Sequence, residues 1–186
     1  FVFAYLTGRR LFKTPGYAEL CALSIAMVHL IGISAHTVFT HTIALGAALF
    51  MTWWAVLRVL QERRSWDYAL LGIACALGTL AKYNFVLVLA PILLVGLAKR
   101  DTRAVVLDGR MLIAIGVAAL MLAPHTIWVH DARFDFLDRL RKSSGVEAYE
   151  DYGANISAGF ADLVSTLLVE LAPFWIVAAI AFWPQL

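Results

Sequence analysis

The chain contains few charged side chains for its length. Only 15% of its 186 residues are Asp, Glu, Lys or Arg, whereas 62% are hydrophobic, and the mean hydropathy is +0.79. A soluble domain normally carries more charge, so a soluble helical core is the weaker interpretation of this composition. The net charge of +2 is too small to indicate a nucleic-acid-binding protein. The composition therefore predicts a membrane protein.

Cysteine is also scarce. The two cysteines, Cys21 and Cys75, both lie inside apolar stretches. Two cysteines in such places support neither a disulfide framework nor a zinc site. We therefore interpret both as small residues of the helical core.

Apolar runs recur along the chain at intervals of about one bilayer crossing, separated by short charged segments. Because helices satisfy their own backbone groups in lipid, the pattern predicts an all-α, polytopic transmembrane helix bundle. Residues 130–160 are expected to form an external segment, with an amphipathic helix in the membrane interface followed by a loop. The expected spans, about six, cover residues 17–34, 43–60, 68–81, 83–98, 111–129 and 162–183.

The beginning of the sequence, FVFAYLTGRR, contains neither a starting methionine nor the charged region of a signal peptide. Phe1 to Leu6 has the character of the end of an earlier span, and Gly8 to Gly16 that of a basic connection. We expect residues 1–186 to form a single transmembrane domain within a longer membrane protein.

One lysine, Lys82, interrupts a long apolar run. As a single helix, residues 68–98 would be about 45 Å long at 1.5 Å per residue, against a hydrocarbon core of about 30 Å. Two short spans that meet in a tight turn at Lys82, Tyr83 and Asn84 would instead place both flanking basic loops, residues 61–67 and 99–110, on the cytoplasmic side. The positive-inside rule prefers this second arrangement, so we expect Lys82 at the external membrane surface.

Two interpretations of Lys82 are open from the residues alone. Its side chain could reach from a helix end to the lipid headgroups, as long cationic side chains commonly do. Alternatively, its ammonium could bind an anionic phosphate, such as that of a lipid carrier, as a compact point charge. The residues favour the two interpretations about equally.

The predicted topology gathers polar residues at the external surface and arginines at the cytoplasmic one. A one-sided polar cluster in an apolar bundle indicates a candidate site. Its histidines form two pairs with a spacing of five residues, whereas two metal ligands on one helix face are four residues apart. We therefore expect contacts to substrate or headgroups, with no metal and no cofactor. The cluster comprises His36, His41, Lys82, Tyr83, Asn84, His125 and His130.

Three segments resemble those of the bacterial family 39 glycosyltransferases, in the superfamily of dolichyl-phosphate-mannose protein mannosyltransferases and lipid A aminoarabinose transferase. The first, LGIACALGTLAKYNFVLVLAPILL, is similar to the family's lysine turn, a small-residue helix followed by "TKYN" and an apolar run with proline. The second, PHTIWVHDARFDFLDRL, resembles the family's proline-aromatic segment after a later span. The third, residues 35–54, resembles the helix pair that precedes the lysine turn.

This resemblance implies an integral-membrane glycosyltransferase in the bacterial cytoplasmic (inner) membrane, with its active face external. The donor would be a polyprenyl-phosphate-linked sugar, whose phosphate would meet Lys82. Tyr83, His36, His41 and His125 would then line the substrate pocket. Membrane lipids are the other expected partners, and the acceptor is not identified.

Two departures from the family's pattern affect these expectations. Many relatives carry a Thr-Asp pair where this chain has Thr40-His41, so the role of that carboxylate is not carried over. The family's catalytic acid lies in a first external loop, which would precede Phe1. The catalytic base that activates an acceptor hydroxyl is therefore expected outside these residues.

Two other classes of function stay open. A transporter or flippase-like permease could use an intramembrane lysine together with Glu170 along a substrate path, and would show inverted repeats that this sequence does not display. A membrane scaffold without chemistry would leave the one-sided polar cluster unexplained.

Overall fold

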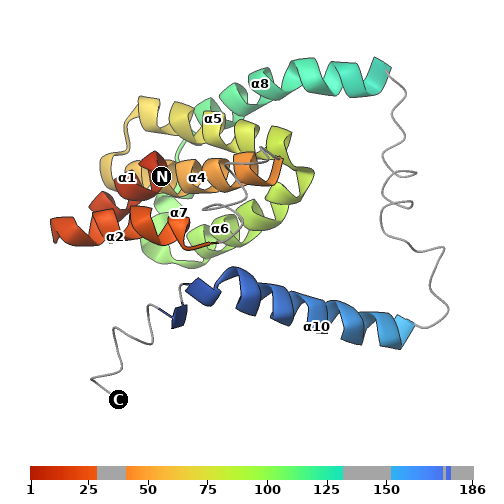
Figure 1. The fold of residues 1–186 in the computed structure, drawn as a ribbon. Helices are drawn as coiled ribbons and strands as arrows, with labels where there is room; N and C mark the ends of the chain where they lie inside the picture. The colour runs from red at the N-terminus through yellow and green to blue at the C-terminus, as the bar shows by residue number, and fades with distance from the viewer. Residues whose placement is uncertain (29–40, 132–151, 174, 177–186) are drawn as a thin grey trace. The chain divides into compact units, whose positions relative to one another are not determined.

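A computed structural model describes residues 1–28, 41–131, 152–173 and 175–176, and the regular elements within these ranges are all helices (Figure 1). The predicted all-α class is therefore confirmed. The chain divides into two compact units, Phe1–Pro124 and His125–Leu186, which are described separately below.

Two of the described helices are long and apolar enough to cross a membrane. They are α4 (His41–Glu62) and α8 (Met111–Asp131). Both coincide closely with the expected spans 43–60 and 111–129. The other apolar helices are shorter, so the count of six spans stays a prediction.

The first two helices pack against each other and α1 also packs against α4. They are α1 (Val2–Leu11) and α2 (Pro15–Ala26). A Cβ atom at Gly8 would lie only 2.9 Å from the Cα of Ala18, so a glycine is needed where the two helices approach. The expectation that Gly8 begins a connection is wrong, because α1 continues through Leu11. The expected span 17–34 is described only as far as residue 28, and His36 lies outside the described residues.

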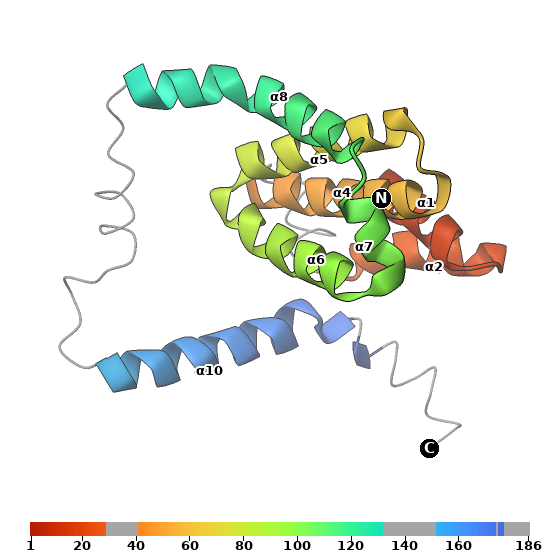
Figure 2. The ribbon, with the colours of Figure 1, turned by 180° about the vertical axis from the view of Figure 1, so that it is seen from behind.

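Helix α5 (Ser65–Ala81) follows α4 after a short connection and runs back along it as an antiparallel neighbour (Figures 1 and 2). Small side chains allow this close approach, as is typical of helix pairs in membranes. A Cβ atom at Gly72 would also collide with the carbonyl oxygen of Ala114, so α8 approaches α5 closely at this point. The residues buried along the pair are mostly small: Ala48, Thr52, Ala55 and Val59 on α4, and Asp67, Tyr68, Gly72, Ala74, Ala76 and Gly78 on α5.

A buried ion pair holds the connection between α4 and α5. The Nε atom of Arg58 lies 2.6 Å from Oδ1 of Asp67, whose side chain is fully buried. The other oxygen, Oδ2, accepts a hydrogen bond from the backbone N–H of Arg64 at 3.1 Å and caps α5. Arg58 also lies over the ring of Trp54, 5.1 Å from its centroid. The loop position expected for Asp67 is wrong, since the carboxylate belongs to the first turn of α5 and is paired.

The chain continues from α5 through a short 3-10 helix, η2 (Tyr83–Phe85), into α6 (Val86–Ala98) and α7 (Arg100–Val106). The expectation that residues 99–110 form only a loop is wrong, because α7 occupies much of this segment. Val105, which is 2% exposed, fastens α7 to a core cluster with Val59, Tyr68 and Ala114. Burial of one apolar side chain therefore stabilises a helix that its charged sequence does not indicate.

In the second unit, α10 covers Tyr152–Glu170. The boundaries expected here are wrong, since the helix begins well before residue 162 and includes the end of the expected external loop. Apolar side chains such as Phe160, Leu163 and Leu167 are exposed along it. The amphipathic helix expected between residues 134 and 141 lies outside the described residues.

We predict that Asp67→Ala destabilises the folded protein by about 3 kcal/mol, because the substitution leaves the charge of Arg58 without its buried partner. The exposed Asp101→Ala on α7 is the matched control. Thermal unfolding of both variants in the same detergent tests the prediction. Equal unfolding temperatures for the two variants would contradict it.

Candidate functional site

The helix breaks at Lys82, as the sequence predicts. Helix α5 ends at Ala81, and Lys82 has an extended backbone with φ −162° and ψ 128°. Its N–H donates a hydrogen bond to the carbonyl of Gly78 at 3.0 Å, and its carbonyl accepts one from the N–H of Phe85 at 2.9 Å. Both backbone groups of Lys82 are therefore satisfied within the turn, which fixes the point where its side chain leaves the chain.

The side chain of Phe85 packs against the last turns of α5 and so holds this turn in place. This side chain is fully buried, and a Cβ atom at position 78 would lie 2.5 Å from the Phe85 ring. A glycine is thus required at Gly78, because the ring occupies the space of any side chain there. The sequence pattern alone singles out neither Phe85 nor its contact with Gly78. The spacing between them, which spans the lysine turn, is a signal that could have indicated the contact.

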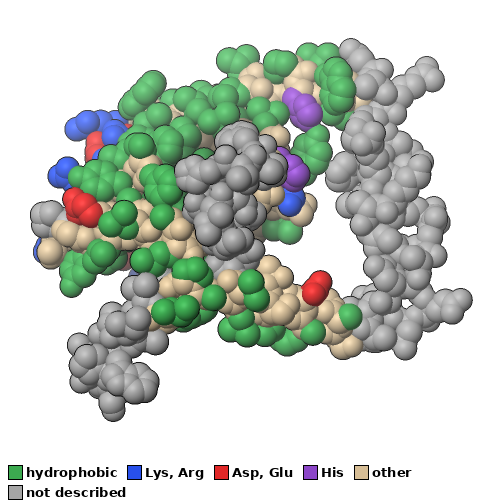
Figure 3. All heavy atoms as spheres, viewed as in Figure 1, with side chains coloured by type: hydrophobic (Ala, Val, Ile, Leu, Met, Phe, Trp, Pro, Cys, Tyr) green, Lys and Arg blue, Asp and Glu red, His purple; other side chains and the backbone are tan. Residues whose placement is uncertain are grey.

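The side chain of Lys82 differs from the arginines at the other end of the same helix pair. It is half-buried, and the structure shows it no carboxylate partner within the ranges described. Arg10, Arg58 and Arg64, in contrast, each pair with an acid near the end of α4, where Figure 3 shows blue and red side chains together. Lys82 follows the last turn of α5, where the helix dipole favours a cation. The turn therefore presents an ammonium group that can bind an anion.

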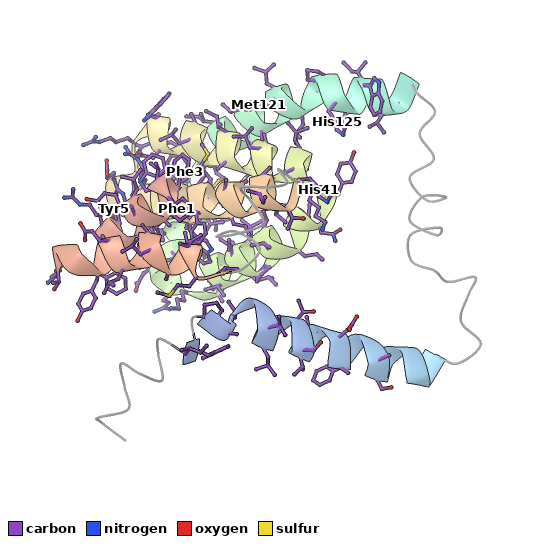
Figure 4. The ribbon with its side chains drawn as sticks, viewed as in Figure 1. Phe1, Phe3, Tyr5, His41, Met121 and His125 are labelled. Atoms are coloured by element: carbon purple, nitrogen blue, oxygen red, sulfur yellow. The ribbon has the colours of Figure 1, made fainter. Side chains whose placement is uncertain are left out.

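His41 lies at the same end of the α4 and α5 pair as Lys82. It is exposed and is the first residue of α4 (Figure 4). Because α4 and α5 are antiparallel, the start of α4 lies beside the end of α5, which Lys82 follows. Tyr83 opens η2 and is 44% exposed. The structure thus brings Lys82, Tyr83 and His41 to one end of this pair.

The other predicted site residues are not placed at this end by the structure. His125 belongs to the second unit, on α8, where its ring centroid lies 6.0 Å from that of Trp128 (Figure 4). His36 lies outside the described residues, so the roles of both stay predictions. Across the parts of the chain that are described, no group of three or more His, Cys, Asp or Glu side chains could hold a metal ion.

A family model described as dolichyl-phosphate-mannose-protein mannosyltransferase matches residues 1–128. This range is more than half of the chain and includes α1 to α7, the lysine turn and most of α8. The chain belongs to this family. The dolichyl-phosphate-mannose-protein mannosyltransferase family is the one that the lysine turn resembles, so that prediction is confirmed.

Two curated proteins from Rhizobium johnstonii are similar to this family member. The lipopolysaccharide core galacturonosyltransferase RgtA is 33% identical over 129 residues, which cover 69% of this chain and 26% of RgtA. The lipopolysaccharide core galacturonosyltransferase RgtB is 24% identical over 186 residues, which cover 97% of this chain and 37% of RgtB. The chain therefore spans between about a quarter and two fifths of the length of these relatives. No solved structure matches it at a significant level.

We predict that Gly78→Ala destabilises the lysine turn, because the added Cβ forces the buried ring of Phe85 to move. Overpacking of this kind costs about 1–3 kcal/mol. Gly116→Ala on α8 is the matched control, since its Cβ would meet no atom within 4 Å. Thermal unfolding should show a loss only for Gly78→Ala, and a second substitution, Phe85→Leu, should recover part of it. A Gly78→Ala protein as stable as the Gly116→Ala control would rule out the contact.

Proposed function

We propose that this chain is part of an integral-membrane glycosyltransferase that moves a sugar from a polyprenyl-phosphate-linked donor to an acceptor. The reaction would take place at the external face of the bacterial inner membrane. Membership of the mannosyltransferase family and the two transferases similar to the chain support the reaction class. The apolar helices α4 and α8 support the membrane setting.

The observation that carries the proposal is the ammonium of Lys82, which has no acidic partner among the described residues and lies on a turn fixed by backbone hydrogen bonds and by Phe85. Sugar transfer from a polyprenyl phosphate leaves a phosphate group whose negative charge grows as the glycosidic bond breaks. A cation held in place stabilises that charge without having to reorganise. Because the site lies beside lipid, water screens the attraction less than in bulk solvent.

The neighbouring polar groups of this site would hold the sugar. Tyr83 and His41 share the helix-pair end with Lys82 and offer hydrogen-bond donors and acceptors. We include His36 and His125 in the same pocket on the strength of the predicted topology. No metal or other cofactor has a role in this scheme, and nucleic acid is not a partner.

The catalytic carboxylate that takes the proton of the acceptor hydroxyl as general base would come from a part of the enzyme outside residues 1–186. The chain would form one transmembrane domain of that longer enzyme and would supply the phosphate-binding half of its site. A galacturonosyl donor with a lipopolysaccharide core acceptor is the first pair to assay, because the similar proteins RgtA and RgtB are named for that transfer. The permease alternative has no such support.

We predict that the lysine turn is reached from outside the cell and that the α6–α7 corner is reached from inside. Cysteine would be introduced at Asn84 or at Arg100, both exposed, in a protein with Cys21 and Cys75 replaced by serine. A membrane-impermeant maleimide added to intact cells should label Asn84→Cys and leave Arg100→Cys unlabelled until the cells are opened. The reverse pattern would place the site on the cytoplasmic face.

We predict that Lys82→Ala in the full-length protein lowers kcat for sugar transfer by about 100-fold or more, the effect of removing one group that stabilises developing charge. Lys82→Arg should retain a measurable part of the activity, because it keeps the charge but changes its geometry. Lys13→Ala is the control, since this exposed lysine follows α1, whose Arg10 contacts the end of α4 remote from Lys82. Transfer by Lys82→Ala at the rate of the Lys13→Ala control would exclude the proposed role.

A further inference from the structure

A second feature of the first unit is an apolar pocket of about 430 Å³ between α4, α6 and α7. Trp53, Val56 and Val59 of α4 form one wall, and α6 supplies another with Ile92 and Val95. The volume falls within the range of about 300–1,000 Å³ that is usual for small-molecule sites. The pocket lies near the charged end of α4, because most of its lining comes from the second half of α4, from α6 and from α7.

One charged residue, Lys99, lines this apolar pocket. It separates α6 from α7, is exposed, and has no ion-pair partner in the part of the chain that the structure describes. Backbone hydrogen bonds hold this corner, from the N–H of Lys99 to Val95 and from the N–H of Arg103 to Lys99. Regular backbone structure therefore fixes the point at the pocket from which the Lys99 side chain extends.

The surroundings of Lys99 add positive charge. Arg100 and Arg103 lie on the first turns of α7, with Asp101 as the acid between them. The side chain of Arg103 folds back onto the carbonyl of Leu97 through Nε at 2.7 Å, which keeps its guanidinium at the corner. An apolar cavity with a net positive rim suits a molecule that has a hydrocarbon chain and an anionic head.

We propose that this pocket binds an anionic membrane phospholipid, with one acyl chain between α4, α6 and α7 and its phosphate at Lys99. The site is distinct from the one at Lys82. Helix α6, with 13 residues, separates the two lysines, and at 1.5 Å per residue it is about 20 Å long. One phosphate cannot contact both, and the proposal does not depend on the transfer reaction.

The test measures phospholipid retained by the purified full-length protein, using native mass spectrometry after addition of phosphatidylglycerol or phosphatidylcholine. The wild type should retain phosphatidylglycerol in preference to phosphatidylcholine. Lys99→Ala should lower retention of phosphatidylglycerol about fivefold, as expected for one lysine at an anionic surface. Val95→Trp should lower the retention of both lipids, because the indole fills the pocket.

Matched controls separate the pocket from the general lipid surface. Leu94→Trp adds the same side chain at the preceding position of α6, which is exposed and does not line the pocket. Lys13→Ala removes an exposed lysine that does not line the pocket. Both should retain lipid as the wild type does. Three results would overturn the proposal: equal effects of Val95→Trp and Leu94→Trp, no selectivity for the anionic lipid, or displacement of the phospholipid by undecaprenyl phosphate that depends on Lys99.

Discussion

The arrangement of the first unit depends on the buried contact between Arg58 and Asp67. The carboxylate has no exposure to water, so the guanidinium of Arg58 and the N–H of Arg64 supply the polar contacts that its burial requires. These partners come from the last turns of α4 and from the connection to α5. The ion pair therefore holds the end of α4 beside the start of α5. Glu62 extends the contact to Arg10 and thereby brings in α1.

This fixed helix pair has two different ends. At one end arginines and acids neutralise one another and bind to backbone groups, and at the other end Lys82 follows the helix without a described acidic partner. The register set by Arg58 and Asp67 therefore also determines where His41 and Lys82 lie. One end of the helix pair therefore has a structural role, and the other end presents a cation that can bind the phosphate of the proposed site.

The sequence was sufficient for those features that depend on local chemistry. Hydropathy located α4 and α8, and the interruption of an apolar run by Lys82 located the turn between α5 and α6. The features that were missed depend on contacts between distant residues. Nothing in the local pattern shows that Asp67 is buried against Arg58, that Val105 holds α7 onto a core, or that Phe85 fills the space beside Gly78. The placement of His36 and His125 at the site stays a prediction for the same reason.

Chemical rescue at position 82 tests the central claim most directly, because it separates the charge from the rest of the side chain. Lys82→Cys, in a full-length protein with Cys21 and Cys75 replaced by serine, should bind undecaprenyl phosphate weakly and transfer sugar poorly. Alkylation with bromoethylamine restores an ammonium at nearly the original distance and should recover both properties, whereas a neutral alkyl group of similar size should not. Equal recovery with the neutral group, or full activity of the unmodified cysteine variant, would contradict the account.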